Sequence, residues 1–343
     1  MSSFANKKVL VTGATGLIGS NLVDRLMKDN SDVKVTILAR NEDKVLNTFA
    51  DYLNNSNFEY IIQDITEPIN SLEKFDYIFH AAGSIAGEAI RNYPVDVINA
   101  NIQGTINCLE YLKNQTHGRI IIFSSATVYG NCDNQRIVNE SDTQLTDSLD
   151  NPICAYSQSK RMAETIARAY NTQYNVDVII ARFSYVFGYT KYYPNTAIFN
   201  FIQKALNGDD IVLNGINLAR RDNIYVEDAV DMLLEAAQYG NSGEAYNLSS
   251  NAENDNFAAI DEITELIVNS ANKLTNMSAK LVKKPFEDID RLPGLIMDNA
   301  KIKSVSLHKL NITKLSEAIY KTVKNYYDIC AKKGENAYDK IYR

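Results

Sequence analysis

The sequence has few cysteines and histidines, and neither residue type is clustered. The three histidines share no spacing typical of metal ligands, and the four cysteines lie far apart, at Cys108, Cys132, Cys154 and Cys330. Scattered cysteines fit reduced thiols better than a disulfide framework or a zinc site. We therefore predict no disulfide and no metal site.

The chain also lacks long apolar runs and runs of positive charge. No window of about 18 uninterrupted apolar residues occurs, and the N-terminal apolar stretch is short and interrupted by Thr12 and glycines. The 42 acidic residues outnumber the 35 basic ones, which gives a net charge of −7. We expect a cytoplasmic protein with no signal peptide, no membrane span and no nucleic-acid partner, although a local basic pocket for a small anion remains compatible with this composition.

The length and composition are those of a large α/β protein. The 343 residues are 45% hydrophobic and include 21 Tyr and 12 Phe, which allows a substantial core and excludes disordered and coiled-coil proteins. The first half alternates β-rich runs with helical patterns. Expected strands cover 8–12, 33–38, 58–62, 76–80, 119–123, 178–182 and 244–248, and expected helices cover 17–28, 97–113, 155–174 and 225–237.

Strands that are apolar on both faces and separated by helices are typical of a doubly wound parallel sheet. We predict an α/β Rossmann-type fold with a smaller C-terminal substrate-binding domain. The dinucleotide-binding domain would comprise 1–182 and be completed by about 222–248. The substrate-binding domain would comprise 183–221, expected to be loops and one helix, and the mostly helical tail 249–343.

A glycine-rich segment separates the first expected strand from the first helix. Glycine permits a tight turn and lets the backbone approach a pyrophosphate at the positive end of a helix. The spacing GxxGxxG alone is also compatible with an ordinary strand-to-helix turn. Because the context favours a dinucleotide site, we assign to it Gly13, Thr15, Gly16, Leu17, Ile18 and Gly19.

The end of the second expected strand indicates which dinucleotide binds. NAD sites usually place a carboxylate about 20 residues past the last glycine, where it binds the adenosine ribose. Ala39 cannot accept those hydrogen bonds, whereas Arg40 could pair with a 2′-phosphate. The alternative is that Arg40 is a solvated loop charge. We predict that NADP(H) is the favoured cofactor and that NAD(H) is possible.

Tyr156 and Lys160 lie four residues apart, on one face of an expected helix. A nearby ammonium and a nicotinamide cation would favour the phenolate and lower a pKa that is normally near 10. Tyr156 is therefore a candidate acid/base. The spacing alone is weak evidence, because Tyr320 and Lys324 repeat it on a tail helix that we interpret as structural.

Hydroxyl residues follow the expected strand 119–123, at the carboxyl edge where open α/β sheets bind ligands. Ser125 in this position could hydrogen-bond a reacting carbinol or carbonyl and share its proton with a tyrosine. Taken alone, the segment is better explained by hydroxyls that cap a strand end.

In their order and spacing, these motifs resemble the nucleotide-sugar epimerase/dehydratase branch of the extended short-chain dehydrogenase/reductase family. The resemblance covers most of the chain. Its segments are GATGLIGS (13–20), Asp64, HAAG (80–83), NIQGT (101–105), SSATVYG (124–130), YSQSK (156–160) and RDNIYV (221–226).

The resemblance implies a role for each matching residue. Tyr156 would be the acid/base, Lys160 would bind the nicotinamide ribose and lower the tyrosine pKa, and Ser125 would bind the reacting C4 oxygen. Further implied cofactor contacts are Asp64 and Ile65 at the adenine, Ala81, Ala82 and Gly83 along the cofactor channel, and Asn101 supporting the site. Implied substrate contacts are Ser84 and Thr127 at sugar hydroxyls, Tyr185, Arg221 at the nucleotide diphosphate, and Arg291 as a weaker diphosphate candidate. For Arg221, the alternative is a surface arginine paired with Asp222.

The chain also departs from the family pattern. The 4,6-dehydratases carry an Asp-Glu pair directly after the catalytic hydroxyl residue, where this chain has Ala126 and Thr127. Elimination of water needs that acid and base, so we predict no dehydratase activity. Tyr185 stands where Asn is common, and Gly294 stands where an Asp often follows the residue matched by Arg291.

We predict an NAD(P)-dependent enzyme that acts at C4 of a nucleotide-diphosphate sugar, as a 4-epimerase or a 4-ketoreductase. Selection of NADP(H) by Arg40 would favour the reductase, and a retained cofactor would favour the epimerase. The alternatives are a noncatalytic dinucleotide-sensing protein on the same fold and a reductase of a non-sugar carbonyl. The resemblance also implies a homodimer formed through the helices near 97–113 and 155–174.

Overall fold

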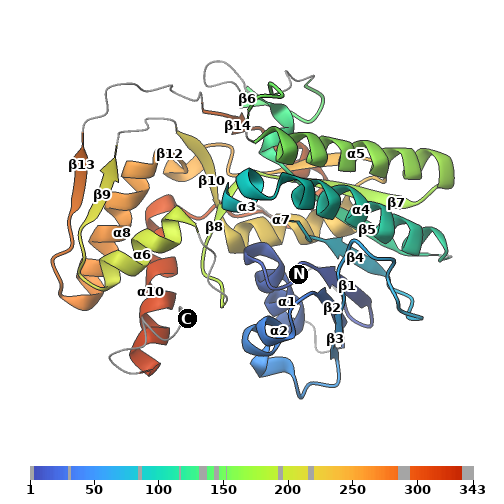
Figure 1. The fold of residues 1–343 in the computed structure, drawn as a ribbon, viewed down its shortest axis with the longest axis horizontal. Coiled ribbons are helices and arrows are strands. Elements are labelled where there is room, and N and C mark those ends of the chain that lie inside the picture. The colour runs from blue at the N-terminus through green and yellow to red at the C-terminus, as the bar shows by residue number, and fades with distance from the viewer. Residues whose placement is uncertain are drawn as a thin grey trace.

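The computed structural model describes residues 4–29, 32–83, 87–115, 117–130, 137–142, 147–151, 153–191, 196–214, 220–284 and 294–333. Seven strands of this part form one central sheet (Figure 1). They are β1 (Lys8–Thr12), β2 (Lys34–Ala39), β3 (Phe58–Ile62), β4 (Tyr77–His80), β5 (Arg119–Ser125), β7 (Asp177–Phe183) and β11 (Ala245–Leu248). Their order is β11-β7-β5-β4-β1-β2-β3, and each neighbouring pair is parallel. The structure therefore confirms the predicted Rossmann-type doubly wound sheet.

Helices cover both faces of this sheet (Figure 1). On one face lie α1 (Leu17–Asp29), α2 (Glu42–Thr48) and α7 (Val226–Tyr239), and on the other lie α3 (Gly87–Asn92), α4 (Pro94–Lys113) and α5 (Cys154–Tyr174). The expected strands and helices of the first half all form, within a few residues of their predicted ends. Strand β5 continues to Ser125, because its ladder with β7 extends to the pair Ser125 and Phe183.

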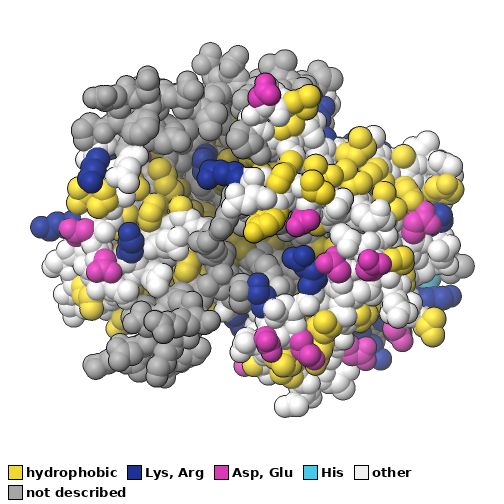
Figure 2. All heavy atoms as spheres, in the orientation of Figure 1, with side chains coloured by type: hydrophobic (Ala, Val, Ile, Leu, Met, Phe, Trp, Pro, Cys, Tyr) yellow, Lys and Arg dark blue, Asp and Glu magenta, His cyan; other side chains and the backbone are white. Residues whose placement is uncertain are grey.

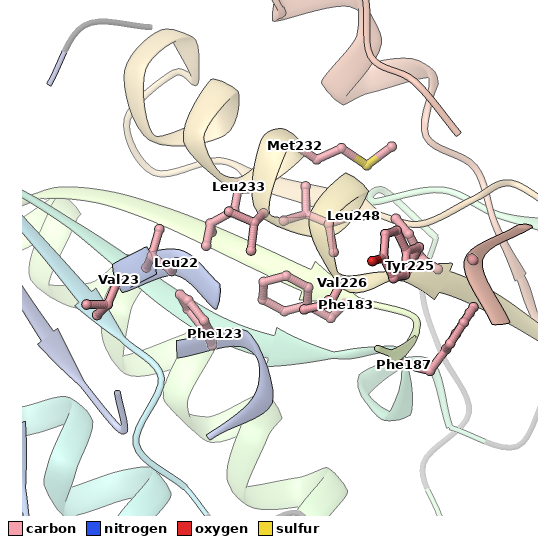
Figure 3. Packing of buried hydrophobic residues seen from close by; sticks show 14 of the residues in the cluster. Leu22, Val23, Phe123, Phe183, Phe187, Tyr225, Val226, Met232, Leu233 and Leu248 are labelled. Atoms are coloured by element: carbon pink, nitrogen blue, oxygen red, sulfur yellow. The ribbon is translucent and has the colours of Figure 1, made fainter. Parts of the chain in front are cut away.

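Residues of β5 alternate between the two apolar cores. Ile121 and Phe123 pack with α1 and α7, as Figure 3 shows for Phe123 beside Leu22 and Leu233. Ile120 and Ile122 pack in the second core, with α4 and α5. Successive strand side chains point to opposite faces, so Ser124 has the parity that directs its side chain towards α5.

The remaining elements form three small sheets and a group of helices beside the main sheet (Figure 1). Their strands are β6 (Ile137–Val138), β8 (Tyr185–Phe187), β9 (Ile211–Asn214), β10 (Arg221–Tyr225), β12 (Phe257–Ala258), β13 (Leu281–Lys284) and β14 (Ile296–Met297). The helices are α6 (Ala197–Leu206), α8 (Ile260–Thr275), α9 (Ala300–Val305) and α10 (Leu315–Lys333), with 3-10 turns η1 (Ala50–Tyr52), η2 (Ala126–Tyr129) and η3 (Glu253–Asp255).

Two of these strands correct the expectation of loops and a single helix over 183–221. Besides α6, this region holds β8, which pairs with β10, and β9, which pairs with the distant β13. Both strands are short, and their partners lie far along the sequence, so local periodicity does not show them. The division into two domains stays a prediction. Among the described residues, no helix combines the length and the apolar character needed to cross a membrane.

Candidate active site

The glycine-rich segment forms a close turn between β1 and α1, at the point where β1 adjoins β4. Gly13 has φ +64, and a Cβ on it would lie 2.6 Å from the carbonyl carbon of Ala81. A Cβ on Gly19 would lie 2.6 Å from the Gly13 carbonyl oxygen. The backbone N–H of Gly16 closes the turn by donating to the same oxygen at 3.1 Å. This close packing of backbone requires glycine at both positions, and such a turn at the start of a helix is where dinucleotide-binding folds hold a pyrophosphate.

Arg40 and Asp64 meet at the ends of β2 and β3. Arg40 Nη1 lies 3.6 Å from Asp64 Oδ2, although the Arg40 side chain is 75% exposed. Burial alone would raise the pKa of Asp64, but hydrogen bonds from the backbone and hydroxyl of Thr66, together with Arg40, hold it below its usual value. Arg40 and Asp64, both predicted to contact the adenosine half of a dinucleotide, are thus neighbours in the structure and form an ion pair.

The loop after β4 packs against two polar residues of the opposite helices. Thr12 Oγ1 accepts from the backbone N–H of Ala82 at 3.2 Å, which ties this loop to β1. A Cβ on Gly83 would lie 2.5 Å from Asn101 Oδ1 and 3.4 Å from Lys160 Nζ. Asn101 Nδ2 donates to Ser159 Oγ at 2.9 Å, while its Oδ1 is buried with no hydrogen-bond partner in the described part of the chain. An unpartnered oxygen beside an ammonium suits polar groups of a cofactor.

The structure brings Ser125, Tyr156 and Lys160 together at the carboxyl edge of β5. Lys160 Nζ donates to the Phe123 carbonyl oxygen at 2.8 Å and lies 5.9 Å from the centroid of the Tyr156 ring. The Ser125 hydroxyl lies close enough to the Tyr156 phenol to lower its pKa, and Thr127 Oγ1 donates to Ser125 Oγ at 3.1 Å. Tyr156 and Lys160 are both buried. A phenol with a hydroxyl and an ammonium close by can transfer a proton and have its charged form stabilised.

Burial shifts the pKa of both ionisable groups in this cluster. Desolvation raises the pKa of Tyr156 to about 12, against the lowering effect of its hydrogen bond with Ser125, and nearby Tyr185 raises it further. Desolvation lowers the pKa of Lys160 to about 8, and Glu164 opposes that shift. In the protein without its cofactor, desolvation therefore raises the pKa of this tyrosine, and the expected fall, which includes the charge of a bound nicotinamide, stays a prediction.

Arg221 and Tyr185 stack on each other beside this cluster. The guanidinium carbon of Arg221 lies 4.5 Å from the centroid of the Tyr185 ring. The alternative pairing of Arg221 with Asp222 is wrong, because the Asp222 carboxylate is buried and accepts from Ser250 Oγ and from Met297 N at 3.1 Å. The other predicted substrate contacts, Ser84 and Arg291, lie outside the described residues.

Sequence reasoning missed two charged residues behind the site, Glu164 and Arg182. Each interrupts a buried apolar pattern, Glu164 one helical turn after Lys160 and Arg182 near the end of β7. The sequence did contain a signal for them, a charged residue at a position that periodicity assigns to the core. Buried charges are normally paired, so such a residue predicts a buried ion pair.

The sequence model of the NAD dependent epimerase/dehydratase family matches residues 9–249. The chain belongs to this family. The resemblance to extended short-chain dehydrogenases/reductases that act on nucleotide sugars is thereby confirmed. Members of this family are NAD-dependent, and the glycine turn, the loop after β4 and the Ser125 cluster lie within the matched residues.

Two curated relatives show the range of activities in this family. A dTDP-D-glucose 4,6-dehydratase of Dictyostelium discoideum is 29% identical over 76% of this chain, a match that spans 62% of the relative's length. The UDP-glucuronic acid decarboxylase 3 of Arabidopsis thaliana is 29% identical over 76% of this chain and 75% of its own.

Solved structures share the fold across almost the whole chain. A UDP-N-acetylglucosamine 4-epimerase from Methanobrevibacter ruminantium has a TM-score of 0.78 at 24% identity, covering 95% of this chain and 100% of that one. A dTDP-glucose 4,6-dehydratase from Bacillus anthracis, in complex with NAD, has a TM-score of 0.76 at 23% identity, covering 94% and 97%. At these identities the likeness establishes the fold.

Proposed function

We propose that the protein is an NAD(P)-dependent enzyme that oxidises or reduces C4 of a nucleotide-diphosphate sugar, as a 4-epimerase or a 4-ketoreductase. The observation that carries this proposal is the grouping of Ser125, Tyr156 and Lys160, with Tyr185, on which Arg221 stacks, close enough to affect the Tyr156 pKa. Acid/base groups and a cation for a diphosphate thus belong to one region of the structure.

Each residue has a distinct task in this reaction. When bound, an oxidised nicotinamide supplies a hydride acceptor and a positive charge. Tyr156 takes the proton of the C4 hydroxyl, and the nearby Ser125 hydroxyl hydrogen-bonds and orients that oxygen. Lys160, which is anchored on the Phe123 carbonyl, binds the ribose and stabilises the phenolate that Tyr156 forms.

The residues after Ser125 favour reaction at C4 alone. Dehydration needs a further acid and base beyond the tyrosine. Here the positions that would supply them are Ala126 and Thr127 in η2, and Thr127 already donates to Ser125 Oγ. The chain therefore has the acid/base groups for reaction at C4 at this edge but no carboxylate at position 126 or 127.

The choice between epimerase and reductase depends on the cofactor that the enzyme keeps. A 4-epimerase returns its hydride to the same sugar, so one retained NAD serves many turnovers. Arg40 favours the reductase as the second candidate, because its largely exposed guanidinium at the end of β2 is placed for the 2′-phosphate of NADP(H).

We also propose a cytoplasmic homodimer formed through α4 and α5. These helices lie side by side on the face of the sheet opposite to α1 and α7, and Figure 2 shows hydrophobic side chains over them. Tyr93 just before α4, Val95 on α4 and Met162 on α5 are among the exposed apolar residues. A second copy placed against them would remove this apolar surface from water.

The test is turnover of UDP- and dTDP-linked hexoses with NAD(H) and NADP(H), with the product identified by NMR. We expect Tyr156→Phe to lower kcat by at least about a thousandfold while dinucleotide affinity stays unchanged. Tyr320→Phe is the matched control, since Tyr320 and Lys324 repeat the spacing on α10, and it should retain full activity. Dinucleotide binding without turnover of any sugar would instead support a noncatalytic sensor, and turnover of a non-sugar carbonyl would support the other alternative.

A further inference from the structure

A buried ion pair lies directly behind the Ser125 cluster. Glu164 projects from α5 and Arg182 from β7, and their side chains are 9% and 11% exposed. Arg182 Nη2 donates to Glu164 Oε2 at 2.7 Å, and Arg182 Nε donates to Glu164 Oε1 at 2.9 Å. This two-pronged contact fixes both the distance and the angle between the helix and the strand.

The pair holds the segment that carries Ser125 from both sides. Ser124 is the ladder partner of Arg182, and its hydroxyl donates to Glu164 Oε1 at 2.5 Å. On the other side of Ser125, Arg182 Nη1 donates to the Tyr129 hydroxyl at 2.9 Å. Tyr129 donates in turn to Asn247 Oδ1 at 2.7 Å, which ties the end of η2 to β11.

Glu164 and Ser124, which are hydrogen-bonded to each other, lie on the same elements as residues of the cluster. Glu164 lies one helical turn beyond Lys160 and two turns beyond Tyr156 on the same helix, while Ser124 immediately precedes Ser125. A shift of α5 relative to β5 would therefore change the contact between Ser125 and Tyr156. Small displacements of this kind are costly to catalysis.

We propose that Glu164 and Arg182 are positioning residues, which set the register of α5 on β5 and place a negative charge one helical turn from Lys160. The pair touches neither the proposed substrate nor the cofactor site. Its value as a stabilising contact is small by itself, because desolvation of two buried charges offsets most of their attraction. The expected effect on kcat rests on the proposed function. The expected effect of Glu164 on the Lys160 pKa does not.

The charged and titratable groups that face Lys160 come from three elements. On α5 they are Tyr156 and Glu164, and on β4 the group is His80, whose pKa burial and Lys160 lower to about 3 so that it is neutral. Arg182 on β7 reaches Lys160 only through Glu164. Among these described groups, Glu164 is therefore the carboxylate that opposes the lowering of the Lys160 pKa by burial.

Glu164→Gln removes the charge and the contact with Arg182 Nη2, while its amide oxygen can still accept from Ser124 Oγ and Arg182 Nε. The matched control is Asp177→Asn, which removes the ion pair of Asp177 with Arg119, whose Nε lies 2.8 Å from Asp177 Oδ2. That pair joins β5 to β7 at the opposite edge of the sheet, where both strands begin. The control therefore removes an ion pair to a β7 residue without approaching Lys160.

In wild-type enzyme shown to need Tyr156, we expect Glu164→Gln to lower kcat by about tenfold or more, with KM changed by less than about threefold. The high-pH limb of the kcat profile should move to lower pH, because Lys160 loses its proton more easily. Asp177→Asn should change neither kcat nor the pH of the high-pH limb. Ser124→Ala, which keeps the ion pair but frees the strand end, should lower kcat without moving the limb, and it tests the positioning role even if Glu164→Gln does not fold.

A second measurement needs no turnover. In protein labelled with 13Cε-lysine, the Lys160 resonance is identified by its loss in Lys160→Met, and its titration midpoint is followed with pH. We expect a lower midpoint in Glu164→Gln than in wild type and Asp177→Asn. If neither the Lys160 titration midpoint nor the high-pH limb of the kcat profile changes in Glu164→Gln, the electrostatic role is overturned. If kcat is normal in both Ser124→Ala and Glu164→Gln, the positioning role is overturned. Failure of every nucleotide sugar as a substrate would refute the proposed function but leave the lysine titration interpretable.

Discussion

The guanidinium of Arg221 lies 4.5 Å from the centroid of the Tyr185 ring, and Tyr185 in turn lies close enough to Tyr156 to affect its pKa. A guanidinium stacked on an aromatic face is held in one plane, with its N–H groups free at the edge. Because the Tyr185 side chain remains 46% exposed, this pair is accessible to a ligand. It connects a cation suited to a diphosphate with the proposed acid/base.

Replacing Arg221 should therefore weaken substrate binding selectively. We expect Arg221→Ala to reduce nucleotide-sugar affinity by about 10- to 100-fold, since a charged hydrogen bond contributes about 1.5–3 kcal/mol. Affinity for NADH should not change, because Arg221 lies away from the glycine turn. Calorimetric titration measures both.

The neighbouring arginine provides the control for this experiment. Arg220 is half exposed and pairs with Glu262 on the surface. Arg220→Ala should leave both affinities unchanged, and an equal loss of sugar affinity in the two variants would argue against a specific role for Arg221.

Replacing Arg40 should change the choice of dinucleotide. If its guanidinium binds the 2′-phosphate, Arg40→Ala should weaken NADPH binding by about tenfold and leave NADH binding within about twofold. Fluorescence titration with the two reduced cofactors measures this ratio. Lys28→Ala is a suitable control, because Lys28 is an exposed cation on α1 that pairs with Asp24. Wild-type protein that prefers NADH, with both affinities unchanged in Arg40→Ala, would exclude the NADP(H) role.

Asp222 should make stability depend on pH in the mildly acidic range. Burial raises its pKa to about 6 from an ordinary value of 3.8, against the lowering effect of hydrogen bonds such as that from Ser250. The folded state therefore binds the proton more tightly than the unfolded state. The stabilisation from the protonated form is complete below about pH 4 and is lost as the pH rises through 6.

The difference between wild type and Asp222→Asn isolates this effect. Relative to the variant, the wild-type free energy of unfolding should fall by about 2 kcal/mol between pH 4 and pH 6.5. Urea unfolding at several pH values measures it, and a constant offset from altered hydrogen bonding does not affect the slope. The exposed Asp209→Asn serves as the control. Parallel curves for wild type and Asp222→Asn would contradict the prediction.

The sequence by itself determined the elements whose signals are local. Strands β1 and β3 have their predicted bounds, because a short run of β-forming residues between turn residues marks a strand whether it is buried, as β1 is, or at the sheet edge, as β3 is. The turn at Gly13 follows from the steric freedom of glycine, and the i, i+4 spacing places Tyr156 and Lys160 on one face of any helix. These features depend on residues within a few positions of one another.

Only the tertiary structure decided which distant residues meet and in what environment. It paired β9 with β13, stacked Arg221 on Tyr185 instead of pairing it with Asp222, and placed Arg182 against Glu164. It also buried Tyr156, so that desolvation raises its pKa in the protein without a cofactor. Register, burial and desolvation are set by contacts between segments far apart in the chain, and one strand's periodicity contains no information about the helix that will cover it.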